Sequence, residues 1–242
     1  MVLVDDLHWR YWRSRRTMPR ESLIKWFTDG RPVSSDEMIS ALTRAPELAA
    51  EVEASTQNTV LHYACCNAAP ARVVKALITA YPDAVKALDK DNNLPISGAV
   101  ANGASAEAVQ LLLTKFPKSV RHRADGTHTL LHSAACNGQS ANTVNAILSA
   151  WPEAAAERDE HGNAPLHFAA ACKAAPAVVH ALLQACPEAT CWRGQNQRLP
   201  LSLCFLCEAP ATSVKAILDA NPEALRTPEL VADYHNHGLG VS

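Results

Sequence analysis

The feature that most constrains this 242-residue chain is a proline that recurs at a fixed interval. Five prolines follow one another in steps of 35 residues, and a sixth precedes them by 36. They are Pro82, Pro117, Pro152, Pro187 and Pro222, preceded by Pro46. Neighbouring positions agree as well, since a large or apolar residue precedes four of the five prolines and Pro-Glu-Ala occurs three times. This period indicates one supersecondary unit copied along the chain, whose copies bury their apolar faces against each other.

Each copy predicts two helices joined by a tight turn. A short apolar motif begins about 21 residues before each proline, as at 60–64 and 165–169. An apolar stripe follows, such as Val109, Leu112 and Leu113, whose i, i+3, i+4 spacing places the side chains on one helix face. The expected starts of the second helices are Pro70, Ser105, Ser140, Pro176 and Pro210. Serine bonds the free amides at a helix start, and proline lacks the amide that would be unpaired there.

A polar turn closes each row of the repeat. These turns contain Gly, Asn and Asp, which tolerate a positive φ or bond their own backbone. They span 89–92, 124–127, 159–162 and 194–197. The recurring proline ends the second helix, because it cannot donate a hydrogen bond to the preceding turn. The sequence therefore predicts an all-α fold, a solenoid of about six helix-turn-helix rows with a degenerate first row.

These motifs resemble the ankyrin repeat. The pattern Pro-Leu-His-x-Ala, opened by a turn like Asp-x-x-Gly and followed by a Val-Val-x-x-Leu-Leu helix, is best seen at 165–169 after 159–162. The motifs at 60–64 and 130–134 are close, whereas those at 95–99 and 200–204 lack the histidine. The rows are about two residues longer than the 33 residues typical of the family. The resemblance covers residues 57–231 and implies a solenoid that binds proteins through a concave face.

The chain divides into an arm, an array and a tail. Residues 1–20 form the arm, and residues 232–242 form a tail without an apolar stripe, which we expect to fray. The expected rows of the array are 21–56, 57–91, 92–126, 127–161, 162–196 and 197–231. In the first row we expect a helix at 22–27, and Ser34 with Glu37 has the spacing of a capping box.

The N-terminal arm differs from the array in composition. Residues 8–20 contain five arginines and three large aromatic residues but no acid. The candidate contact residues in the arm are Trp9, Arg10, Trp12, Arg13, Arg15 and Arg16. Arginines with aromatics suit nucleic acid or an acidic surface. The alternative is a short helix that covers the open end of the first row, with its tryptophans packed down and its arginines in water.

Composition excludes several classes of function. The formal net charge of −2 argues against broad nucleic-acid binding by the array, so nucleic acid is expected only through residues 8–20. No apolar run is long enough to span a membrane. Acids occur among the first residues, so we expect no secretory signal and an intracellular protein, in the cytoplasm or, as the alternative, in an organelle.

The cysteines are expected to be reduced core residues. Six of the eight fall on the expected first helices: Cys65, Cys66, Cys136, Cys172, Cys204 and Cys207. Cysteines at equivalent positions of adjacent rows should lie a helix-packing distance of about 8–10 Å apart, beyond the reach of a disulfide. The single Cys-x-x-Cys at 204–207 has no second ligand pair, so no structural zinc site is predicted.

The histidines and the missing catalytic motifs argue against an enzyme. His62, His132 and His167 occupy one repeat position, too far apart to share a metal ion. The ankyrin resemblance implies that they bond backbone and turn groups of neighbouring loops. We find no Gly-x-Ser-x-Gly, His-Glu-x-x-His or phosphate-binding loop, and we expect no catalytic residue, metal or cofactor.

The remaining candidate site is a protein-binding face. The position after the motif histidine and the loop tips vary between rows, as recognition positions do in the ankyrin family. The expected anchors are Tyr63 and Phe168 at the first of these positions and Arg198 at a loop tip. The other expected contacts are the loop-tip residues Asn58, Asn93, His128 and Asn163. The alternative for Phe168 and Leu203 is packing against adjacent rows. Trp192 and Arg193 form a second candidate patch.

Two functional hypotheses follow. The first is a non-catalytic scaffold or adaptor, a monomer or subunit of a hetero-complex, that binds a protein partner through the concave face. The alternative is a structural subunit of a large complex, such as a ribonucleoprotein, anchored by the arginine- and tryptophan-rich arm.

Overall fold

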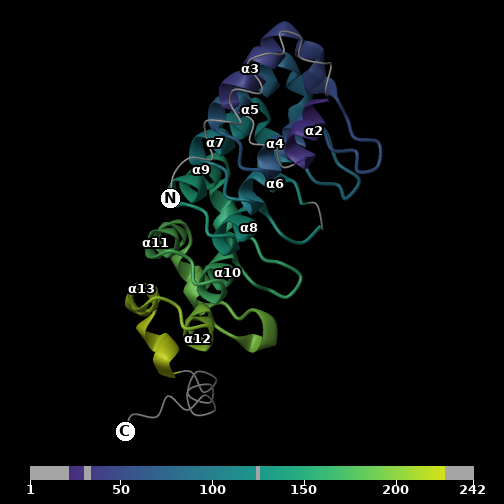
Figure 1. Ribbon diagram of the computed structural model, residues 1–242. Coiled ribbons are helices and arrows are strands. Elements are labelled where there is room, and N and C mark those ends of the chain that lie inside the picture. Colours follow the sequence, from purple (N-terminus) through teal and green to yellow (C-terminus); the bar gives the residue numbers. More distant parts are fainter. Residues whose placement is uncertain (1–21, 30–33, 124–125, 227–242) are drawn as a thin grey trace.

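The computed structural model describes residues 22–29, 34–123 and 126–226 (Figure 1). Within them, five rows each contain a first helix of seven residues and a second helix of ten. The first helices are α4 (Val60–Cys66), α6 (Pro95–Ala101), α8 (Leu130–Cys136), α10 (Pro165–Ala171) and α12 (Pro200–Leu206). The second helices are α5 (Ala71–Ala80), α7 (Ala106–Lys115), α9 (Ala141–Ala150), α11 (Pro176–Ala185) and α13 (Ala211–Ala220). The predicted all-α solenoid is confirmed.

The row before these five is shorter in its first helix. It consists of α2 (Leu23–Thr28) and α3 (Ser35–Arg44). The predicted capping box is present, because the Ser34 hydroxyl accepts a bond from the Glu37 amide and the Glu37 carboxylate accepts one from the Ser34 amide, both at 3.2 Å. The arm at 1–20 and the tail at 232–242 lie outside the described residues, so the interpretations of both stay predictions.

The recurring proline both ends one helix and begins another. Each starts a short 3-10 helix: η1 (Pro46–Ala50), η2 (Pro82–Lys86), η3 (Pro117–Arg121), η4 (Pro152–Ala156), η5 (Pro187–Cys191) and η7 (Pro222–Arg226). Another 3-10 turn, η6 (Gln195–Gln197), lies in the last described loop. Proline suits a first helical position because its φ is preset and no amide is lost. The small residue two positions later, such as Ala84 or Ala154, is buried in the core, which explains the Pro-x-Ala pattern.

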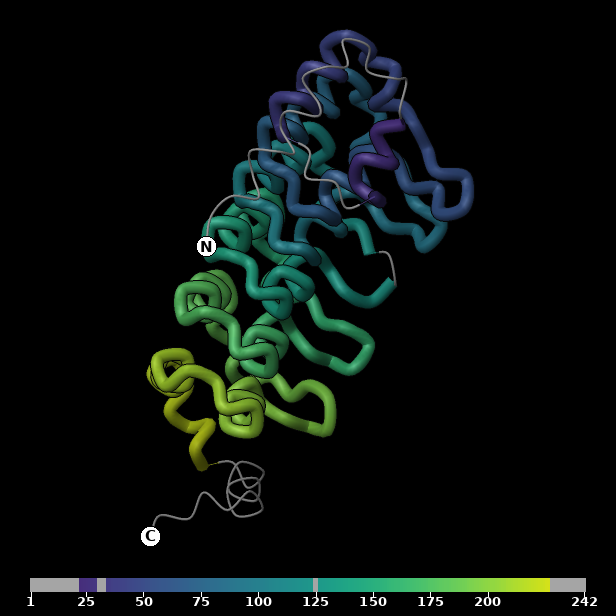
Figure 2. The backbone as a smooth tube through the Cα atoms, in the orientation of Figure 1, coloured from purple at the N-terminus to yellow at the C-terminus, as the bar shows by residue number. Residues whose placement is uncertain are grey.

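The rows stack in sequence order from the purple end to the yellow end (Figure 2). The second helices line one side of the stack, the first helices lie next to them, and the long loops project from the opposite side (Figure 1). The core runs through all rows as two columns of buried aliphatic side chains. The first-helix column is Leu61, Ile96, Leu131, Leu166 and Leu201, and the second-helix column is Leu77, Leu112, Ile147, Leu182 and Ile217. Each buried side chain of this kind stabilises the fold by about 1.5–3 kcal/mol.

The turn between the two helices of each row contains a residue in the left-handed region. The residues and φ values are Ala68 (49°), Gly103 (78°), Gly138 (67°), Lys173 (56°) and Glu208 (53°). Left-handed backbone is costly for residues with a Cβ and favours glycine. Three of the five rows therefore have strained turns, at Ala68, Lys173 and Glu208.

Replacing the strained alanine should stabilise the array. We expect Ala68→Gly to raise the free energy of unfolding by about 0.5–1 kcal/mol, because Ala68 is exposed and its main cost is the positive φ. The matched control, Gly103→Ala, should lower it, since an added Cβ meets no atom within 4 Å and only the φ of 78° opposes it. Urea unfolding of the full chain measures both, and a loss of stability in Ala68→Gly would contradict the prediction.

Candidate partner-binding face

The first helices expose a narrow stripe without charge. None of the residues of α4, α6, α8, α10 and α12 is Asp, Glu, Lys or Arg. Neighbouring rows and the second helices cover most of their surface. The position after the motif histidine is half-buried in all five rows, and we call these residues the inner stripe: Tyr63, Gly98, Ser133, Phe168 and Leu203.

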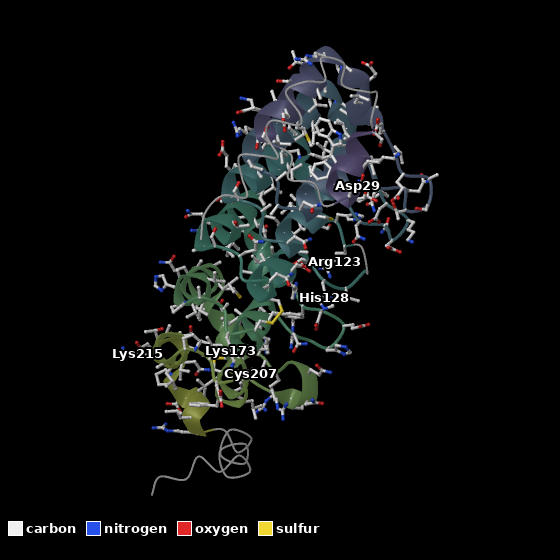
Figure 3. All side chains as sticks on the ribbon, viewed as in Figure 1. Asp29, Arg123, His128, Lys173, Cys207 and Lys215 are labelled. Atoms are coloured by element: carbon white, nitrogen blue, oxygen red, sulfur yellow. A yellow bond between two sulfur atoms is a disulfide. The ribbon has the colours of Figure 1, made fainter. Side chains whose placement is uncertain are left out.

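The opposite side of the array carries charge at three of the five second helices. Among the second helices, α5, α7 and α13 carry exposed ionic side chains such as Arg72, Lys75, Glu107 and Lys215, whereas α9 and α11 contain no Asp, Glu, Lys or Arg. Figure 3 shows Lys215 on the second-helix side, whereas Arg123 and His128 lie toward the loops. The inner stripe is thus an uncharged band with charged loops along one edge.

Three buried histidines each tie one loop to the next. The Nδ1 atom of His62 accepts a hydrogen bond from the Thr59 amide at 3.1 Å, and its Nε2 donates to the carbonyl oxygen of Asn93 in the next loop at 3.1 Å. The same pair of bonds joins His132 to the Thr129 amide and the Asn163 carbonyl, and His167 to the Ala164 amide and the Trp192 carbonyl. The structural role that the ankyrin resemblance implied for these histidines is confirmed. The bonds hold the loops at a set distance from one another.

Burial keeps these histidines neutral. It lowers the pKa of His62 and His167 and lowers that of His132 to about 4, while the bond to the next loop carbonyl acts in the opposite direction. In neutral imidazole one nitrogen accepts and the other donates, as both bonds of each ring require.

The buried histidines make stability depend on pH. The folded pKa of His132 lies below the ordinary value of 6.5, so the unfolded chain binds a proton first as the pH falls. We expect the free energy of unfolding to be unaffected by His132 above pH 6.5 and to fall between pH 6.5 and about 4, by on the order of 3 kcal/mol from this residue. Urea midpoints across this range measure the effect. His132→Gln should be less stable at pH 7.5 but less sensitive to pH, and an unchanged slope would contradict the assignment.

Arginines at another repeat position brace the loops. Arg123, Arg158 and Arg193 are spaced by 35 residues, and each donates to the carbonyl oxygen four residues later, at 2.7–3.0 Å. The guanidinium of Arg158 also lies 5.5 Å from the centre of the Trp192 ring. Sequence reasoning missed this role, although the regular spacing of the arginines was a usable signal. The second candidate patch, Trp192 with Arg193, is therefore partly engaged within the loops.

Two predicted contact residues are used inside the array. Asn163 is only 9% exposed; its side-chain amide donates to Asp159 at 3.0 Å and its Oδ1 accepts from the Gln195 amide at 2.9 Å. Asn93 donates to Asp89 in the same way at 3.1 Å and is half-buried. We therefore leave Asn163 out of the proposed surface.

The internal role of Asn163 has a measurable consequence. We expect Asn163→Ala to lower the free energy of unfolding by about 1–3 kcal/mol, because it leaves Asp159 and the Gln195 amide with fewer partners in a buried loop. Asn145→Ala is the matched control, since Asn145 is exposed on α9 and its loss should change stability by less than about 0.5 kcal/mol. Equal stabilities in a urea titration would sink this assignment.

Phe168 anchors one part of the inner stripe. Its ring meets His128 and His132 edge-on, with centroids 5.3 and 5.1 Å apart. Nε2 of His128 lies 3.7 Å from a carboxylate oxygen of Asp159. Phe168 thus packs on the preceding row, as the packing alternative predicts. It is also only half-buried, so part of its ring remains available to a partner. Leu203 likewise packs on the core while remaining half-buried.

Tyr63 lies on α4, several rows away from Phe168 on α10. Its hydroxyl donates to Glu53, which also accepts from Thr56 at 2.6 Å. Burial, with the bond to Glu53, raises the pKa of the Tyr63 hydroxyl. Asn58 and Arg198 are half-buried in the loops that precede α4 and α12. The structure brings Phe168 and His128 together, whereas Tyr63 and Arg198 lie rows away from each other, so the candidates form an extended face and not one pocket.

The prediction that the cysteines are unbonded is wrong for one pair. Cys136 and Cys172 form a disulfide, with Cα atoms 5.1 Å apart. The prediction compared positions 35 residues apart, whereas this pair is 36 apart and joins diagonal neighbours at the ends of α8 and α10. The pair Cys172 and Cys207 is unbonded, as expected.

The other cysteines are free but differ in exposure. They are Cys65, Cys66, Cys186, Cys191, Cys204 and Cys207. Cys65 and Cys204 are buried as expected, and burial raises the pKa of the Cys204 thiol to about 12. Cys66 is exposed and Cys207 is half-buried, so the expectation of core thiols is wrong for these two. Their helix ends face the surface because the turn to the second helix leaves them uncovered.

Two further observations concern metals and membranes. In the part of the chain that the structure describes, no three His, Cys, Asp or Glu side chains are grouped so that they could hold a metal ion. The described helices are all too short or too polar to cross a membrane.

These features define a helical-repeat protein whose rows are tied through their loops. The sequence of residues 96–193 matches the family model for ankyrin repeats, in three copies, so the chain contains ankyrin repeats. Ankyrin repeats are a protein–protein interaction module, and the family is generally non-catalytic.

Comparison with solved structures supports the fold. A chain of the complex of the Bd0816 predatory endopeptidase from Bdellovibrio bacteriovorus with immunity protein Bd3460 superposes with a TM-score of 0.62. The two chains are 15% identical, and the match covers 84% of this chain and 99% of the other. At that identity the likeness shows the fold alone. No curated protein matches the sequence.

Proposed function

We propose that this protein is a non-catalytic scaffold or adaptor that binds a protein partner along the inner stripe and the adjoining loops. The observation that carries the proposal is the complete lack of ionic side chains on five first helices whose half-buried positions include Tyr63, Phe168 and Leu203. The central part of a protein interface is depleted of charge and enriched in aromatic residues. Three of the second helices, α5, α7 and α13, carry exposed ionic side chains, and α9 and α11, which carry none, contain no Phe, Tyr or Trp.

The loops supply a polar rim to this face. Exposed or half-buried charged residues lie along them, among them Asp91, Glu160 and Arg198. A charge-poor centre with a polar rim is the usual arrangement of specific interfaces. His128, which contacts Phe168, lies between the two zones.

Rigidity favours binding at this face. The histidine and arginine bonds described above set the loop positions within and between rows before any partner arrives. A preformed surface loses little conformational entropy on association, so more of the contact energy remains as affinity.

A charge placed in the inner stripe tests the proposal. We expect Ser133→Glu to abolish partner capture by immobilised full-length protein without unfolding it, because Ser133 is half-buried at the centre of the stripe. Tyr63→Ala and Arg198→Ala should each weaken binding by about 1–3 kcal/mol, that is, roughly 5- to 150-fold.

Gln110→Glu is the matched control, since Gln110 is exposed on α7 on the side of the second helices. Circular dichroism checks that every variant keeps its fold. Proteins retained equally by the wild type, Ser133→Glu and Gln110→Glu would show that the inner stripe is not the binding surface.

The proposal extends to location. We infer an intracellular, cytoplasmic protein, supported by six unpaired cysteines, two of which are exposed. Free thiols of this number persist in a reducing compartment.

A further inference from the structure

The disulfide lies on the same face as the inner stripe. Cys136 is the last residue of α8, three positions after Ser133, and Cys172 follows the end of α10, four positions after Phe168. Residues three or four apart share a helix face, so both sulfur atoms continue the stripe. Cys172 is exposed and Cys136 is half-buried. Figure 3 shows the bond in yellow, near the labelled His128.

The repeat shows that stacking does not require this bond. The equivalent diagonal positions in the other rows hold Cys66 with Asn102, Ala101 with Asn137, and Ala171 with Cys207. Those rows have helices of the same lengths without a crosslink. The bond therefore adds something that the fold alone does not need.

The surrounding thiols indicate a reversible bond. The other six cysteines are free, although Cys66 and Cys191 are exposed. Disulfides in reducing compartments are mostly transient, catalytic or redox-sensing. We propose that Cys136 and Cys172 form a dithiol–disulfide switch that is closed by small-molecule disulfides of the glutathione class and pins α8 to α10 beside the inner stripe.

Closure proceeds by two thiol–disulfide exchanges. The thiolate of Cys172, the more exposed residue, attacks one sulfur of the small disulfide and releases one small thiol. The thiolate of Cys136 then attacks the sulfur of Cys172 in this mixed disulfide and releases the second small thiol. The two protein thiols lose two electrons and two protons, and the small disulfide gains them as two thiols. Excess small thiol reverses both steps.

The closed bond restricts relative motion of two neighbouring first helices. Ser133 and Phe168 lie on these helices, one turn before the cysteines, so the bond stiffens the middle of the inner stripe. The crosslink itself does not depend on the proposed function. Its effect on partner affinity does, because a stiffer face loses less entropy on binding.

The test uses the full-length chain and glutathione without any partner. Reduced protein is titrated with oxidised glutathione and analysed by intact mass and peptide mapping. We expect loss of two hydrogens with Cys136 joined to Cys172, and reversal by reduced glutathione. In Cys136→Ser a stable glutathione adduct should remain on Cys172, because no resolving thiol is present. Cys66 and Cys207 serve as internal controls that form adducts but no internal bond.

Hydrogen exchange reports the mechanical effect. Amides of α8 and α10 should exchange more slowly in the oxidised protein, while those of α4 and α6 stay unchanged, and Tm should rise. Asn102→Cys tests the geometry independently, since it places a second thiol diagonal to Cys66 and should create a matching crosslink between α4 and α6.

Three results would overturn the switch: a lasting glutathione adduct on Cys172 of the wild type, a different cysteine pair in the peptide map, or oxidation without slower exchange in α8 and α10. Loss of partner capture in the previous experiment leaves this result untouched, so failure of the binding proposal and failure of the switch are distinguishable.

Discussion

Burial of aliphatic side chains between adjacent rows is the interaction on which the rest of this structure depends. Leu131 and Ile147 are fully buried, yet each belongs to a row of two short helices that cannot enclose them alone. Isolated helices of seven or ten residues are marginal in water. Each row therefore folds only because its neighbours complete its core, and the array behaves as a chain of nearest-neighbour contacts. The same stacking hides all but one narrow stripe of every first helix.

Much of this could be predicted from the sequence, because the signals are local and repeated. The 35-residue period, the prolines and the serine caps locate the helices closely; Ser105 and Ser140 cap α7 and α9 as predicted. The structural role of His167 and its two equivalents followed from the family motif. What could not be predicted depends on where two rows meet. Asn163 reads as a variable loop tip, but its burial arises from the next loop, through Gln195.

The bonded pair Cys136 and Cys172 also depends on a contact between rows, which the sequence pattern does not encode. A comparison at equal repeat positions places thiols a helix spacing apart, whereas the ends of α8 and α10 approach diagonally, to 5.1 Å between the Cα atoms of Cys136 and Cys172. Sequence periodicity defines position within a row but not the offset between rows. Phe168 illustrates the consequence for the candidate face, because its contacts with His128 and His132 come from the preceding row. Repeat position alone therefore cannot distinguish a residue that binds a partner from one that packs against the adjacent row.

The difference between contacts within a row and contacts between rows also matters for function. In a nearest-neighbour array, a constraint between two rows changes those rows and leaves distant ones nearly unaffected. The histidine bonds act at the three rows that have the motif and so hold loops at several places along the face. The single disulfide acts between α8 and α10 only. An array of this kind can therefore hold most of its binding face constant while one segment, the one that carries Ser133 and Phe168, is stiffened or released by thiol chemistry.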